Sequence, residues 1–459
     1  MGHCGECMDR PPTVSEIIDQ RPLSRFQIVT MAMCGLVIVL DGFDAQSIGF
    51  LATSMADSLR IPIHSFGPVF GAALLGLMIS TMAAGPIADR WGRKWPIVAC
   101  TLSFGIFAAL TPLAATFNQL VLMRFLTGLG LGGAMSNVVA LSSEYAPKRL
   151  VAVFVTTLFC GMPLGGFLAG VVGSVMLPRW GWQSVFYAGG FLPLALSIVL
   201  ILMLPESVRF LEMRGADHRK IANIMARISP DLAGAELYSA ASREDRRKRM
   251  PVKHLFTEGR AVGTILLWIP FFMNLLILYF VVSWLPALLR QSRLPVSAGI
   301  IAISLFSLGG VAGSFVEGYL MNWRGTPSIL LAEFACSTLL IAALAYSGTF
   351  LITMILTLVL GFVVQGAQGG LAALSATFYP TSIRSTGVGW ALGIGRIGSI
   401  VGPMLGGWML TLGWGPHEII LAGTIPALCA GTAIFLSIWR QKSSSAYPRE
   451  AEIIETEIT

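Results

Sequence analysis

Apolar runs of about 20 residues recur twelve times along the chain, and this recurrence constrains the fold more than any other feature. Each run is long enough to cross a bilayer as a helix, since about 20 helical residues span the roughly 30 Å hydrocarbon core. With 55% hydrophobic and 12% charged residues, the composition is typical of a chain that lies mostly in lipid. We predict an all-α membrane protein with transmembrane helices near residues 26–50, 66–87, 95–115, 120–141, 151–176, 184–204, 262–288, 298–321, 327–347, 349–376, 385–411 and 417–439.

The positions of Lys and Arg predict the orientation, because basic residues are retained on the cytoplasmic side. With the N-terminus inside, 25 of the 31 basic residues fall on that side. The outer loops hold four, and the remaining two lie within helices: the six are Arg60, Arg179, Arg290, Arg293, Arg124 and Arg396. We expect a multi-pass membrane protein with both termini cytoplasmic. The same bias explains the net charge of +7 without a nucleic-acid partner.

One long polar stretch divides the twelve predicted helices into six and six. We expect a cytoplasmic N-terminal tail, a first six-helix bundle, a cytoplasmic central loop, a second bundle and a cytoplasmic C-terminal tail, at residues 1–25, 26–204, 205–261, 262–439 and 440–459. "HCGEC" at residues 3–7 has the spacing of a metal or redox pair, but it stands alone in a polar tail, and we expect no metal and no cofactor.

An internal repeat supports this division. "GPIADRWGRK" at 85–94 aligns with "GYLMNWRGTP" at 318–327, a displacement of 233, and "EYAPKR" aligns with "TFYPTSIR" at the same displacement, with Pro147 over Pro380. Two related six-helix bundles are the architecture in which rocking halves give alternating access to a ligand site near the bilayer midplane.

Two aspartates, Asp41 and Asp44, lie within the first predicted helix. At the centre of a membrane helix each costs roughly 2.5–3.5 kcal/mol, and their spacing places both on one face, which must look into the bundle. Arg124 lies at a depth comparable to that of Asp44, and a buried ion pair between them could be purely structural. Alternatively, a carboxyl group kept from water beside a second one can exchange a proton and bias a two-state carrier.

Arg396 lies near the midplane of the eleventh predicted helix, with no acidic residue within four positions. An unneutralised guanidinium there is a candidate for a two-pronged contact with a substrate carboxylate. A pair with Glu333 or with an aspartate of the first helix is the alternative. A ligand that contains a flat ring would also need an apolar slot with a few polar side chains. The candidates for lining this ring slot are Phe43, Asn137, Asn274, Tyr279, Trp284, Gln365, Gln368 and Trp390. For any one of these, ordinary packing is the alternative role.

"GPIADRWGRK" resembles the loop signature between helices 2 and 3 of the major facilitator superfamily, and "LPESVRFL" at 204–211 resembles the segment that many members place after helix 6. The "DGFD" of the first helix and "YFVVSWLPALL" of the seventh are similar to patterns of its aromatic acid:proton symporters. This resemblance implies the major facilitator fold, a location in the bacterial inner membrane, and proton-coupled uptake of hydroxybenzoate-type carboxylates.

The resemblance also implies a gate. In the superfamily, the aspartate of the loop signature faces a neighbouring helix end and an arginine reaches an acidic group, for which Glu144 is the natural partner. An ionic latch between the loop signature and Glu144 would hold the inner gate closed. The alternative is that these charged residues only fix the orientation of the helices in the membrane. The gating candidates are Gly85, Asp89, Arg90, Gly92, Arg93, Glu144 and Arg149.

Other classes fit less well. The chain has neither HExxH nor GxSxG and only five His, so we do not expect an enzyme. A receptor is expected to have a larger soluble domain than the central loop and tails provide. A superfamily carrier of aliphatic carboxylates, sugars or drugs is the main alternative. We expect a monomer whose partners are an aromatic carboxylate, protons and lipid.

Overall fold

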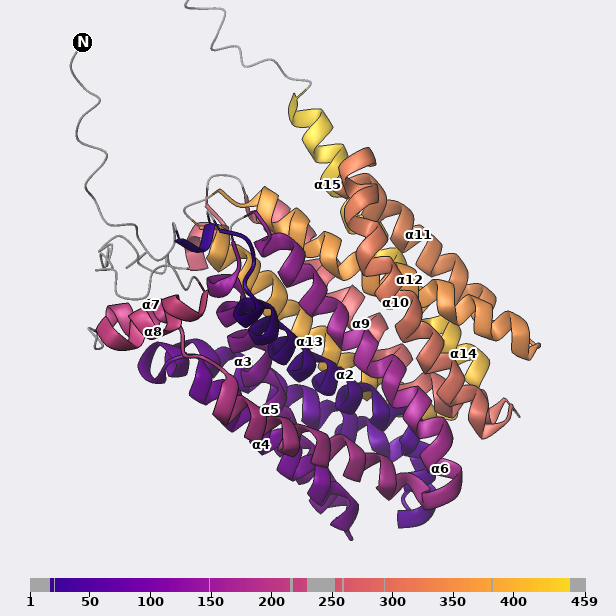
Figure 1. Cartoon of the computed structure of the whole chain (residues 1–459). Coiled ribbons are helices and arrows are strands. Elements are labelled where there is room, and N and C mark those ends of the chain that lie inside the picture. The colour runs from indigo at the N-terminus through magenta and orange to yellow at the C-terminus, as the bar shows by residue number, and fades with distance from the viewer. Residues whose placement is uncertain are drawn as a thin grey trace, which may run out of the picture.

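The computed structural model describes residues 17–19, 21–147, 149–214, 218–228, 252–257, 260–292, 294–380 and 383–445. The HCGEC segment therefore lies outside the described residues, as do most of the N-terminal tail and about half of the central loop. The described chain is helical and without strands. Its long helices run side by side as a bundle, in which the earlier helices form one side and the later ones the other (Figure 1).

The long helices of the first half are α2 (Arg25–Leu59), α3 (Gly67–Trp91), α4 (Lys94–Leu110), α5 (Phe117–Tyr145) and α6 (Val151–Met203). Short helices α7 (Val208–Met213) and α8 (His218–Ile228) follow. The second half contains α9 (Ala261–Gln291), α10 (Val296–Arg324), α11 (Thr326–Ala345), α12 (Phe350–Phe378), α13 (Arg384–Thr411), α14 (Pro416–Ala422) and α15 (Thr424–Ser445).

Within the described residues, 11 helical segments are long and apolar enough to span a membrane. Twelve spans were predicted, and the difference arises because α6 contains two of them, the predicted helices 151–176 and 184–204. As one straight helix, its 53 residues would measure about 80 Å. Gly181 interrupts it with φ 75° and ψ 175°, a conformation essentially restricted to glycine. Gly165 and Gly189 both lie against Phe43, although a continuous helix would hold them about 36 Å apart. The chain therefore folds back at Gly181, and α6 supplies two spans.

Several helix ends differ from the expected ones. α2 continues to Leu59 rather than ending near residue 50, and α15 continues to Ser445, past the expected boundary at 439. Asp89, expected just beyond a helix, lies in the last turn of α3. Apolar composition marks the lipid-spanning part of a helix, but polar turns at its ends remain helical where their backbone hydrogen bonds continue.

The two halves contact one another toward the end of the bundle at which α2 and α9 finish, here called the far end. Gly49 of α2 packs against the carbonyl of Val282, and a Cβ there would lie 2.0 Å from that oxygen, so only glycine permits this approach. Asp57 and Arg290 form an ion pair of 2.8 Å between the same two helices. The opposite end, which carries α7 and α8 (Figure 1), is here called the central-loop end.

Candidate functional site

Asp44 is held in a buried ion pair. Arg124 of α5 donates from Nη1 to Asp44 Oδ1 at 3.0 Å and from Nη2 to Oδ2 at 2.8 Å. Both side chains are 1% exposed, and the guanidinium also lies 5.6 Å from the ring of Phe186. This two-pronged contact neutralises Asp44 and joins α2 to α5.

Asp41 has a different environment, although it lies only one turn away and is equally buried. Neither of its carboxyl oxygens has a hydrogen-bond partner in the described structure. The charges that act on it are the positive charge of Arg396, which is not within ion-pair distance in the described structure, and the negative charge of Asp44. An ionised carboxylate in such a place costs several kcal/mol, because lost hydration is not replaced.

Arg396 faces this aspartate from the other half of the molecule. It is carried by α13, and its Nη2 lies 3.9 Å from the sulfur of Met135 on α5. In the described part of the chain, no carboxylate lies within ion-pair distance of its guanidinium, so neither expected alternative pair forms. The charge of Arg396 also acts on the hydroxyl of Tyr279 on α9. Asp41, Arg396 and Tyr279 thus form a polar group where the two halves meet.

Asn274 is another buried polar side chain of α9. Its Nδ2 donates to the carbonyl of Val364 at 3.2 Å and to Gln368 Oε1 at 3.1 Å, which ties α9 to α12. Its Oδ1 is buried without a partner in the described structure. Asn274 can therefore accept a further hydrogen bond, and a ligand hydroxyl is one possible donor.

The remaining ring-slot candidates have packing contacts. Trp284 is fully buried and donates from Nε1 to the carbonyl of Pro403 at 2.7 Å. Gln365 donates to the carbonyl of Phe306 at 2.9 Å, and Asn137 donates to the carbonyl of Gly133 one turn earlier in its own helix. Phe43 packs beside Gly189, and Trp390 stacks on Trp268 with ring centres 6.0 Å apart. None of these five lies beside Arg396 in the contacts described.

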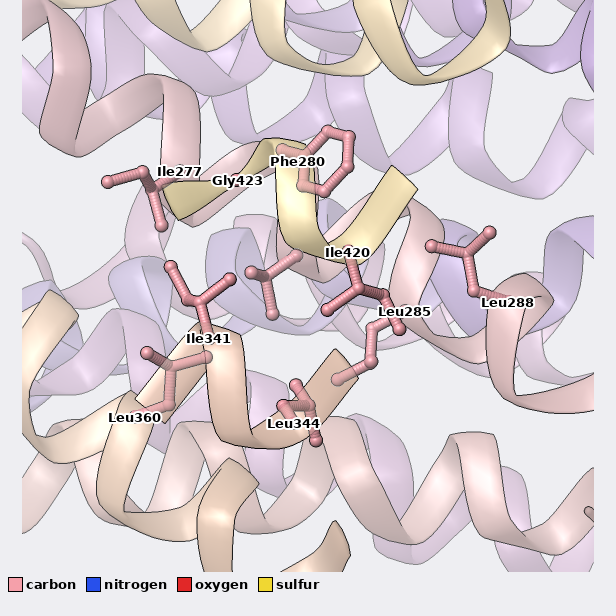
Figure 2. A pocket seen from close by; sticks show the side chains of 10 residues that line it. Ile277, Phe280, Leu285, Leu288, Ile341, Leu344, Leu360, Ile420 and Gly423 are labelled. Atoms are coloured by element: carbon pink, nitrogen blue, oxygen red, sulfur yellow. The ribbon is translucent and has the colours of Figure 1, made fainter. Parts of the chain in front are cut away.

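An enclosed cavity in the second half is not part of this site. Its volume is about 20 Å³, and all of its lining residues, from Ile277 to Gly423, are apolar (Figure 2). This volume is close to that of a single water molecule, and no polar group lines it. It cannot accept a ring carboxylate.

The gate candidates lie at the central-loop end. Arg93 Nε is 3.6 Å from Glu144 Oε1, the pairing that the loop signature indicated. Glu144 also accepts a short hydrogen bond from the hydroxyl of Ser207. Asp89 is exposed, and no basic partner is recorded for it among the described residues.

The other gate candidates contribute backbone hydrogen bonds or helix-end positions, and no ion pair is given for them in the described structure. The carbonyl of Arg90 accepts a short hydrogen bond from Arg214, and exposed Arg149 donates to the carbonyl of Arg21 at 3.3 Å. Gly92 has φ 87°, a conformation that favours glycine, and it ends α3. Gly85 lies within the last two turns of α3.

Sequence reasoning missed Glu206, which organises this end. Its Oε1 accepts from the backbone N–H groups of Arg93 at 2.7 Å, Lys94 at 3.1 Å and Ser207 at 2.8 Å. Tyr145 donates its hydroxyl to the carbonyl of Glu206 at 2.6 Å. A carboxylate at the start of α4 satisfies N–H groups that have no partner within the helix, and it complements the helix dipole. An acidic residue after the sixth span was the signal available in the sequence.

We expect Glu206→Ala to lower the stability of this end. Three N–H groups lose their acceptor, and each one left unsatisfied costs about 1–3 kcal/mol. Water that binds to these groups in the variant would reduce this cost. Glu206→Gln keeps an oxygen at the same place and should lose much less. Thermal unfolding of both purified variants in detergent measures the difference, and equal midpoints for Ala, Gln and the natural chain would contradict the capping role.

The comparisons with known proteins identify the family. A model described as "Major Facilitator Superfamily" matches residues 34–367, more than half of the chain. The chain belongs to the major facilitator superfamily. This confirms the resemblance seen in the loop signature, and members of this superfamily are transporters rather than enzymes.

Relatives within the superfamily are aromatic acid transporters. The chain is 38% identical over 426 residues to the 4-hydroxybenzoate transporter PcaK of Pseudomonas aeruginosa, covering 92% of this chain and 95% of that protein. It is 36% identical over 428 residues to a gallate transporter of Pseudomonas putida, covering 93% and 95%. It is 32% identical over 414 residues to a 3-(3-hydroxy-phenyl)propionate transporter of Escherichia coli, covering 90% and 94%.

A solved structure shares the fold at low sequence identity. The crystal structure of a bacterial homologue of the human lysosomal transporter Spinster, inward-facing and unoccupied, superposes with a TM-score of 0.71 at 16% identity. The match covers 90% of this chain and 97% of that one. It confirms the predicted major facilitator fold.

Proposed function

We propose that this major facilitator carrier imports an aromatic carboxylate into a bacterial cell together with protons. Its relatives are named for 4-hydroxybenzoate, gallate and a hydroxyphenyl propionate, each a ring that bears a carboxylate and a hydroxyl. The observation that carries the proposal is that Arg396 and Asp41 act on one another across the two halves, while neither has an ion-pair partner in the described structure.

In this proposal Arg396 binds the substrate carboxylate. A planar guanidinium matches the two oxygens of a carboxylate, and an anion is favoured where no protein carboxylate already neutralises the cation. Tyr279 beside it supplies a polar ring edge, and the free Oδ1 of Asn274 can accept from a ring hydroxyl. The hydroxyls of 4-hydroxybenzoate and gallate, for which two of the relatives are named, fit such an acceptor.

Asp41, rather than Asp44, is the proposed proton-binding residue. Asp44 already has its charge neutralised by Arg124, whereas Asp41 has no donor at either oxygen among the residues that the structure describes. A proton on Asp41 removes the unfavourable buried charge, and a substrate anion on Arg396 adds a charge of the same sign nearby. Each ligand therefore changes the electrostatic free energy of binding the other, which is the physical requirement for coupling.

The proposed orientation follows the loop charges, with the central-loop end and both termini in the cytoplasm. The carrier is proposed to act as a monomer, because each chain holds both halves of the transport path. Contacts between the halves at the far end, including Asp57–Arg290, would then close the outer side in this conformation.

An uptake assay tests the function. Purified carrier in proteoliposomes is given labelled hydroxybenzoates, benzoate and aliphatic carboxylates, with and without an imposed inward proton gradient. We expect the aromatic acids to accumulate only with the gradient. Equal uptake of aliphatic acids would refute the substrate class, and accumulation unaffected by the gradient would refute proton coupling.

We expect Asp41→Asn to abolish accumulation driven by the proton gradient while exchange of substrate across the membrane continues. Asn keeps the size and polarity of a protonated carboxyl group but cannot release a proton. Counterflow and gradient-driven uptake in the same vesicles separate the two steps, and Glu418→Gln, which also replaces a carboxyl group by an amide but at an exposed position, is the control. An Asp41→Asn carrier that still concentrates substrate would exclude Asp41 from coupling.

A further inference from the structure

A second pair of buried carboxyl groups lies in the other half of the molecule. Glu317 belongs to α10 and Glu333 to α11, and their exposed fractions are 3% and 7%. Each is seven residues from the end of its helix at the central-loop end, a depth of about 10 Å along the helix. Neither takes part in the Asp41 and Arg396 site.

The two side chains converge on one point of α12. A Cβ built on Gly366 would lie 3.5 Å from Glu317 Oε2 and 3.6 Å from Glu333 Oε1. The backbone N–H of Gly370, one turn further on, donates to Glu317 Oε1 at 2.9 Å. Glu333 Oε2 is buried without any partner in the described structure. Glycines at 366 and 370 leave the space that the two carboxyl groups fill.

No positive charge in the described structure compensates this pair. The charged group that acts on Glu317 is Glu333, and the remaining interaction is the Gly370 N–H. No cation is recorded acting on Glu333 either. On α12, Gly366, Gly369 and Gly370 lie beside these carboxyl groups, and they bring no charge to the pair. Two ionised carboxylates so placed repel one another and lack hydration, so one of them is expected to hold a proton.

The internal repeat shows that the fold does not require acids here. At the displacement of 233, Gly366 corresponds to Gly133, Glu333 to Cys100 and Glu317 to Ala84. In the first half the sulfur of Cys100 indeed lies beside Gly133, and Ala84 is buried. The same buried position is therefore filled by uncharged side chains in one half and by two carboxyl groups in the other.

We propose that Glu317 and Glu333 share one proton and form a second proton-binding site, confined to the second half of the carrier. A single proton between two carboxyl groups leaves one negative charge, which the N–H of Gly370 stabilises at Glu317 Oε1. The site does not depend on the role proposed for Asp41, since the two groups lie in different halves.

Infrared spectroscopy tests the shared proton, because protonated and ionised carboxyl groups absorb at separate frequencies. The purified full-length carrier is compared with the Glu317→Gln/Glu333→Gln double variant at neutral pH, in light and heavy water. Gln is uncharged and close in size to Glu, so the fold should be retained. We expect the double variant to lose the intensity of one protonated and one ionised carboxyl group.

Every other outcome overturns the proposal. Loss of two ionised groups would show that the pair holds no proton, and loss of two protonated groups would show that no proton is shared. Glu418→Gln, a change at an exposed carboxyl group, calibrates the intensity of a single group. Asp41→Asn is measured beside them; its spectrum and its uptake phenotype report on the proposed function separately, so either proposal can fail alone.

Discussion

Arg124→Ala is expected to destabilise the folded carrier by about 3–5 kcal/mol, the range for breaking a buried ion pair by removing one partner. The substitution leaves Asp44 as an unpaired carboxylate that is 1% exposed, and it opens a space beside Phe186. Most of this cost arises because the carboxylate of Asp44 stays buried without a partner, and less of it from the lost attraction between Arg124 and Asp44. Thermal unfolding of the purified protein in detergent measures it.

Two control variants make this prediction specific. Replacing both partners, Arg124→Leu with Asp44→Leu, removes the stranded charge and should restore most of the stability, since apolar residues often replace a buried pair at little cost. Arg290→Ala breaks the exposed pair with Asp57 and should cost no more than about 1 kcal/mol. If Arg124→Ala and Arg290→Ala unfold alike, the buried pair does not stabilise the fold.

Arg396→Lys is expected to lower uptake of an aromatic carboxylate at subsaturating concentration by about tenfold or more. Lys keeps the positive charge but loses the planar fork, and hydrogen bonds to charged groups contribute about 1.5–3 kcal/mol each. Arg396→Ala should lose more. Initial uptake rates over a concentration series, together with direct binding, place the effect in substrate affinity.

The control for this variant is Arg179→Lys, the same change at an exposed arginine of α6 outside the proposed site, which should leave affinity unchanged. Membrane insertion and thermal stability of Arg396→Lys should remain near those of the natural chain, because Arg396 has no protein carboxylate to strand. Unaltered affinity in Arg396→Lys would remove the guanidinium from substrate binding.

The functional site was only partly predictable. The depth of each residue along its predicted helix indicated that Arg124 and Asp44 could pair. The same reasoning placed Arg396 and Tyr279 among the candidate binding residues. They did not separate Asp41 from Asp44, because the two are one turn apart on the same helix. Which of them meets Arg124 depends on how α2 and α5 pack. Glu206 was missed because its partners are backbone N–H groups, which have no sequence signature.

The sequence by itself determined the spans, the repeat and the family, because lipid requires an apolar run of fixed length for every crossing and a duplicated half preserves its loop signature. Tertiary structure alone decided which charged groups meet. Glu317 and Glu333 come from two helices and converge on the glycines of a third, and Asp41 faces Arg396 across two halves. Such contacts follow from helix packing, which the order of residues along one helix does not specify.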